Sequence, residues 1–77
     1  MNIDLADVTL HVDETLGSTD LIGLEDAFRN RDGVVSVHVD KKHPHLFVLE
    51  YNPKVVNSKD LLTITQYQGL HGELIGL

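Results

Sequence analysis

Two histidines, His43 and His45, stand two residues apart in the stretch KKHPH, which the sequence predicts as the tip of a hairpin at residues 41–45. Imidazole nitrogens bind Zn, Ni and Cu(II), so both side chains could reach one such ion. The alternative is an exposed polar turn, in which Pro44 sets the backbone and the two preceding lysines repel a cation. We favour the turn.

A second group with metal-binding chemistry is spread over three predicted strands. His11 and His38 are expected on the sheet face opposite the helices, and His71 and Glu73 are expected to share that face on the last strand. Together with Asp13 they could bind Zn weakly. The alternative, which we favour, is a solvated sheet face that carries ordinary polar side chains.

Composition excludes several classes of function. The chain has no cysteine, so disulfides, thiolate metal sites and a cysteine nucleophile are excluded. Twelve acidic residues against six basic ones give a net charge of -6, and a field of that sign repels nucleic acid. No apolar run approaches the roughly 18 residues that membrane insertion needs. The start, MNIDLADV, lacks the features of a signal peptide, and we expect a cytoplasmic protein.

The 77 residues predict one domain, residues 1–77, of the α+β class. Alternating apolar residues predict strands over 6–13, 34–40, about 46–51 and about 71–76. Helical spacing predicts a helix over about 19–31, capped by Ser18 or Thr19, and a second one from a cap at Asn57 or Ser58 to Gly69. This order is the ferredoxin-like βαββαβ arrangement, a four-stranded antiparallel sheet with two helices on one face and the strand order fourth, first, third, second.

The chain resembles the heavy-metal-associated domain of copper chaperones and metal-pumping ATPases over nearly its whole length. The matching positions are Val12, Leu24-Glu25, Ala27-Phe28, Gly33-Val34, Val37, Val39, Tyr51-Asn52-Pro53 and Gly69-Leu70. The resemblance places the family's two metal-binding cysteines at Gly17 and Asp20. Glycine has no ligand atom, and a lone carboxylate is a hard donor that does not suit Cu(I). The family's thiolate chemistry is therefore not carried over.

Three apolar residues, Leu46, Val48 and Ile75, are expected to lie together on the open sheet face, where such clusters mark contact surfaces. We therefore expect a small non-catalytic domain without a resident cofactor, an interaction module related to metal-transport and chaperone proteins, which binds a protein partner or a second copy. One alternative is a domain that binds Zn, Ni or Cu(II) weakly through histidine and carboxylate. The other is an ACT-like small-ligand sensor, which Asp13 and Gly17 in the first loop would fit.

Enzymatic activity is not expected. Acylphosphatases share the predicted topology but hold phosphate with an arginine in the first loop, and residues 14–19 contain none. The serine and threonine residues of the loop are not paired with a base in any recognisable pattern.

Overall fold

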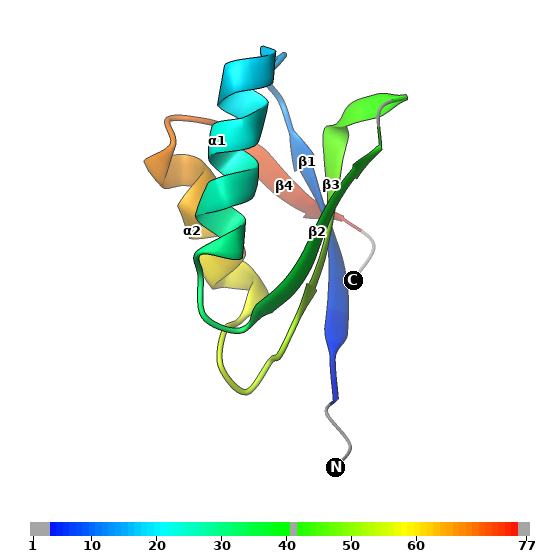
Figure 1. Cartoon of the computed structure of the whole chain (residues 1–77), viewed down its shortest axis with the longest axis vertical. Helices are drawn as coiled ribbons and strands as arrows, with labels where there is room; N and C mark the ends of the chain where they lie inside the picture. Colours follow the sequence, from blue (N-terminus) through cyan, green and yellow to red (C-terminus); the bar gives the residue numbers. More distant parts are fainter. Residues whose placement is uncertain (1–3, 41, 76–77) are drawn as a thin grey trace.

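The computed structural model describes residues 4–40 and 42–75. The elements follow one another as β1 (Ala6–Val12), α1 (Ser18–Arg29), β2 (Val34–Asp40), β3 (His43–Tyr51), α2 (Ser58–Tyr67) and β4 (Gly72–Ile75). The four strands form an antiparallel sheet in the order β2-β3-β1-β4, and both helices lie on one of its faces (Figure 1). The predicted fold class and strand order are confirmed.

The core lies between the helices and the sheet. Alternate residues of β1 and β3 point into it, because successive side chains of a strand face opposite ways. Phe28 of α1 meets Phe47 of β3 edge to face, with ring centroids 5.9 Å apart, and this contact anchors the helix on the sheet. The buried apolar residues are Val8, Leu10, Val12, Leu24, Phe28, Phe47, Leu49, Tyr51, Val56 and Leu61.

The two helices begin differently. Asn57 caps α2 in a capping box: its side chain accepts from the Asp60 backbone N–H at 2.8 Å, and the Asp60 carboxylate accepts from the Asn57 N–H at 3.2 Å. This confirms the predicted cap. Helix α1 instead begins after Gly17, which offers no side-chain cap, so the predicted cap at Ser18 or Thr19 is wrong. Asp20 in the first turn still gives the helix dipole a favourable charge.

Strand β2 contains a register shift that the alternation did not predict. Val34 pairs with Tyr51 and Ser36 pairs with Glu50, so two residues of β2 oppose one step of β3. Val35 is thereby turned outward and is 57% exposed. Strict alternation would have put Val35 on the same face as Val37 and Val39, but it is Val34 that packs against the core with them.

The hairpin between β2 and β3 is tighter than predicted. Asp40 already pairs with His43, and β3 begins at His43, so the expected five-residue tip is wrong; Lys41 lies outside the described residues. A second register shift precedes Asp40. Pro44 has no N–H for the ladder, and proline is tolerated in strands at such irregular ends.

Helix α2 turns one of its large apolar residues to solvent. Tyr67 is 85% exposed, whereas Thr65 is fully buried. The buried residues of α2 are Leu61 and Thr65, which lie one helical turn apart on the same side of the helix. Tyr67 lies on another side of the helix and therefore faces solvent. Neither helix in the described residues has the length and apolar character that crossing a bilayer requires.

Candidate functional site

The open face of the sheet carries a row of side chains across three strands. Thr9 lies between the buried Val8 and Leu10, so it points away from the core. It pairs with Val48 on β3 and with Ile75 on β4, and paired residues of antiparallel strands project to the same face. Val48 and Ile75 are each 41% exposed. The three strands thus present one continuous surface.

Leu46 extends this row toward the upper end of the sheet. It is half-buried, and it pairs with His11 one step further along β1. We call Thr9, Leu46, Val48 and Ile75 the sheet-face patch. The structure therefore brings Leu46, Val48 and Ile75 together on one face, where the sequence placed them.

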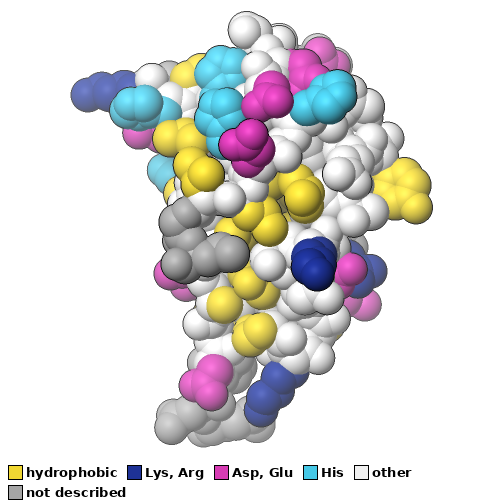
Figure 2. Space-filling model, turned by 180° about the vertical axis from the view of Figure 1, so that it is seen from behind, with side chains coloured by type: hydrophobic (Ala, Val, Ile, Leu, Met, Phe, Trp, Pro, Cys, Tyr) yellow, Lys and Arg dark blue, Asp and Glu magenta, His cyan; other side chains and the backbone are white. Residues whose placement is uncertain are grey.

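The fixed charges on the strands are negative. Asp7 pairs with Glu50 on one side of the patch, and Glu73 pairs with His11 on the other. The described strand residues include no Lys or Arg. Figure 2 shows hydrophobic side chains gathered in the middle of the rear face, with histidine and acidic side chains crowded at its upper end. The strands themselves thus present an apolar centre with acidic side chains on either side of it, while Lys or Arg side chains from outside the strands also appear on this face in Figure 2.

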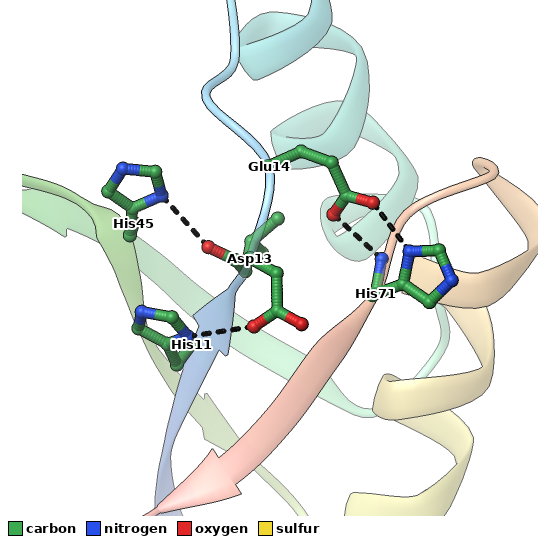
Figure 3. Close-up of polar contacts among 6 residues, drawn as sticks. His11, Asp13, Glu14, His45 and His71 are labelled. Atoms are coloured by element: carbon green, nitrogen blue, oxygen red, sulfur yellow. Dashed lines mark hydrogen bonds and ion pairs between the residues drawn. The ribbon is translucent and has the colours of Figure 1, made fainter.

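Two histidines from different strands meet at the upper end of the sheet (Figure 3). The rings of His11 on β1 and His45 on β3 have centroids 5.8 Å apart and planes inclined by 26°. The Nδ1 atom of His11 lies 3.3 Å from the Asp13 carboxylate. The Nδ1 atom of His45 lies 2.9 Å from the backbone carbonyl of Val12. Each ring is therefore oriented by an oxygen acceptor.

His71 makes a separate contact with the first loop (Figure 3). Its ring Nδ1 lies 2.6 Å from one Glu14 carboxylate oxygen, and its backbone N–H donates to the other at 2.8 Å. The Asp13 N–H donates to the His71 carbonyl at 2.8 Å. The hydrogen bond to Glu14 raises the pKa of His71, and the two hydrogen bonds from His71 lower the pKa of Glu14. These bonds hold the first loop against the start of β4.

The remaining histidines lie apart from that pair. The Nδ1 atom of His43 lies 3.1 Å from Asp40. The backbone N–H of Lys42 and the ring of His43 lower the pKa of the Asp40 carboxyl. His38 is exposed on β2, where it pairs with Val48.

The structure thus groups the predicted metal-binding residues differently from the sequence. His43 and His45 have different partners, and His71 contacts Glu14 rather than His11. His11 does lie opposite Glu73 in the β1–β4 register. Over residues 4–40 and 42–75, no three His, Asp or Glu side chains are placed to hold a metal ion. Metal binding by His11, His43, His45 or His71 stays a prediction.

Two contacts were missed by the sequence analysis. Glu14 and His71 are 57 positions apart, and no local pattern connects them. The predicted strand order, which sets the last strand beside the first, was the signal that could have brought them together. The ring contact between His45 and His11 was missed because β3 was expected to begin three residues later than it does.

The first loop holds the positions that the family resemblance assigns to the metal-binding cysteines. Gly17 has extended backbone angles, φ -70° and ψ 168°, and a Cβ atom at this position would meet nothing within 4 Å. Asp20 is exposed and lines a shallow pocket of about 230 Å³ between the start of α1 and the end of α2. The residues lining this pocket are Thr19, Asp20, Gly23, Gln68 and Leu70, and a single carboxylate is their only charge.

The fold of this chain is similar to that of several solved structures. No protein-family model matches the chain, and no curated protein sequence matches it. Solved structures, in contrast, do match the chain. Oxidised MerP from Ralstonia metallidurans CH34 superposes with a TM-score of 0.84 at 20% identity, over 95% of this chain and 100% of that one.

Two further structures are similar in the same way. The N-terminal domain of a potential copper-translocating P-type ATPase from Bacillus subtilis gives a TM-score of 0.84 at 19% identity, over 95% of this chain and 90% of that one. A copper-binding domain of the P-type ATPase HMA7 gives a TM-score of 0.82 at 17% identity, over 91% of this chain and 93% of that one. This chain therefore has the ferredoxin-like fold of heavy-metal-associated domains, and its sequence has no cysteine.

Proposed function

We propose that this chain is a non-catalytic interaction module that binds a protein partner through the sheet-face patch. The partner has an apolar centre surrounded by lysine and arginine. The observation that carries the proposal is the row formed by Val48, Thr9 and Ile75, in which two large apolar side chains, each 41% exposed, lie on either side of Thr9. The module is related to metal-transport and chaperone proteins through its fold.

Apolar burial alone would not give a tight complex. Complete burial of a valine or isoleucine side chain contributes about 1.5–3 kcal/mol. Since 41% of Val48 and of Ile75 is still exposed, covering them contributes about 1 kcal/mol each. Association itself costs at least about 4 kcal/mol, so the surrounding charged residues must add to the affinity.

Charge favours a basic partner over a second copy. Asp7, Glu50 and Glu73 lie on the strands around the patch, and the chain as a whole carries a net charge of -6. Two such faces would repel one another, whereas a surface bordered by Lys and Arg would be attracted and oriented.

Substitutions at Val48 test this proposal. The immobilised chain is used to capture proteins from its own cell extract, and each captured protein is then purified and its affinity measured by calorimetry. Val48→Asp should weaken binding about tenfold or more, because it places a charge at the apolar centre. Val48→Lys should weaken it further, because it also opposes the partner's basic residues. Raising the salt concentration should weaken the wild-type complex.

The matched control is Val35→Asp, which changes an exposed valine outside the patch and should leave the affinity unchanged. Chemical-shift changes on binding should centre on Thr9, Val48 and Ile75. The proposal is overturned if no purified protein binds with an affinity that depends on Val48. It is also overturned if Val48→Asp weakens binding more than Val48→Lys does. It is also overturned if sedimentation shows that a second copy of the chain occupies the patch.

A further inference from the structure

We infer that the part of the partner that covers the sheet-face patch is a single amphipathic α-helix, whose narrow apolar stripe is bordered by lysine and arginine. This inference rests on the interaction proposed above, and it names the secondary structure and the charge pattern of the partner. The bound helix would add a third layer to the fold, since α1 and α2 cover the opposite face of the sheet (Figure 1).

The hydrogen bonding of the sheet disfavours an extended partner segment. Val48 and Thr9 lie on β3 and β1, and each of these two strands is paired with a neighbouring strand on both sides. Within the described strands, the face at these residues therefore offers side chains to a partner rather than free backbone groups. An extended segment laid across it would bury its own N–H and C=O groups without partners. A helix satisfies those groups within itself.

The size of the patch distinguishes one helix from a second sheet. Neighbouring strands lie about 4.8 Å apart, so Val48 and Ile75, with β1 between their strands, are about 10 Å apart. Leu46 and Val48 are two residues apart on β3, which is a distance of about 7 Å. An area of about 10 by 7 Å matches the width of one helix with its side chains, about 10–12 Å. Two packed sheets would instead need apolar side chains along the full length of several strands.

Carboxylates border the patch along the strands. Two residues before Thr9 on β1, Asp7 pairs with Glu50. Two residues after Thr9, His11 pairs with Glu73. Lysine and arginine carry their charge at the end of a long apolar stem, so residues around the stripe of a helix can reach these carboxylates while their stems cover apolar surface. A helix bordered by Asp or Glu would be repelled.

The chain's own helices do not have the required pattern. Helix α1 carries the three carboxylates of Asp20, Glu25 and Asp26 against one arginine, Arg29. Helix α2 carries one charge of each sign, with Lys59 beside Asp60. A second copy of the chain therefore offers neither helix as a basic one for the patch, and the charge pattern favours a different protein.

Synthetic peptides test the inference without a purified partner. The helical peptide has about 18 residues, with leucine at positions spaced by three and four and with lysine and alanine elsewhere. A second peptide of the same composition has leucine at every second position, which is the pattern of a strand. A third has the helical pattern with glutamate in place of lysine. In ¹⁵N-HSQC titrations, the first should shift Thr9, Val48 and Ile75 and bind about tenfold or more tightly than the second, and the third should not bind.

Variants of the chain show whether the helical peptide binds at the patch. Val48→Asp should weaken its binding about tenfold or more. Glu73→Gln should weaken it less, because it removes one charge at the border and leaves the apolar centre intact. Val35→Asp is the matched control and should leave the affinity unchanged. Equal affinities for the helical and alternating peptides would overturn the inference, and so would helical-peptide binding that Val48→Asp does not weaken.

A partner captured through Val48 separates this inference from the proposed function. The chain has no cysteine, so Ser36→Cys, on the exposed edge strand beside Glu50, gives a single attachment site for a photo-crosslinker. The cross-linked residues of the partner should be spaced by three and four along its sequence. A spacing of two would overturn the helix and leave the interaction module in place. Capture that does not depend on Val48 would instead overturn the interaction module itself.

Discussion

Gly33, in the turn between α1 and β2, offers the sharpest test of the packing. Its φ of +96° lies in the left-handed region that L side chains rarely adopt. A Cβ atom there would stand 2.8 Å from the Val56 Cγ1 and 2.9 Å from the Val55 Cβ. Val56 is only 2% exposed, and the Gly33 carbonyl accepts from the Asn52 N–H at 2.7 Å, so the two segments cannot easily separate. Gly33→Ala therefore introduces both backbone strain at position 33 and steric overlap with Val55 and Val56.

The two costs can be added. Left-handed backbone costs an L residue about 1–2 kcal/mol, and overpacking costs about 1–3 kcal/mol, so Gly33→Ala should lower the free energy of unfolding by about 2–5 kcal/mol. Gly69 is the matched control, because its φ is +77° but a Cβ atom there would meet nothing within 4 Å. Gly69→Ala should therefore cost only the backbone strain, about 1–2 kcal/mol.

Urea unfolding followed by circular dichroism measures both variants. The midpoint should fall further for Gly33→Ala than for Gly69→Ala, with the slope m unchanged because the folded state is the same. Equal losses at the two positions would refute the reasoning, since the overlap with Val55 and Val56 would then cost nothing.

Three further outcomes are expected. Thr65→Val should stabilise the fold by about 0.5–1 kcal/mol in urea unfolding, because the buried hydroxyl makes only a long 3.4 Å bond to the Leu61 carbonyl and a methyl group would gain burial. The advantage of the wild type over Glu14→Gln should be largest between about pH 4.5 and 6.5 in unfolding measured across pH. It should decline above that window, as His71 loses its proton through its raised pKa, and below it, as the carboxylate gains one through its lowered pKa. Gly17→Cys with Asp20→Cys should fold and bind Cu(I) in an anaerobic competition titration, because the backbone at position 17 suits any residue and its Cβ has open space.

Each of these has a control. Thr63→Val removes a similar hydroxyl bond, to the Lys59 carbonyl, on the exposed side of α2 and should not stabilise. A pH profile unchanged by Glu14→Gln would show that the contact with His71 adds no stability. Either single cysteine variant should bind Cu(I) much more weakly than the double one; equal binding would contradict the expected thiolate pair.

Periodic patterns account for what could be predicted of the fold and the patch. Alternation along β1 placed Thr9 and His11 opposite the buried residues, and the same rule placed Leu46 and Val48 on the open face. The cap at Asn57 was equally predictable, because a helix cap depends on a few adjacent residues. Local chemistry therefore determined the elements, their order and the face of each strand.

The site contacts depended on how those elements came together. The register shift that turns Val35 outward and the early start of β3 at His43 both arise from pairing between strands, to which alternation within one strand is insensitive. The exposure of Tyr67 depends on which side of α2 packs against the sheet, and in this fold that is the side that carries Thr65.

By itself, the sequence determined the βαββαβ fold, the absence of thiol chemistry and the half-apolar open face, because these follow from residue type and local spacing. Only the tertiary structure decided which polar residues meet. It set His45 beside His11 and His71 beside Glu14, since these contacts join distant segments through strand register. Register depends on how all the strands and helices pack at once, and no short stretch of sequence contains that information.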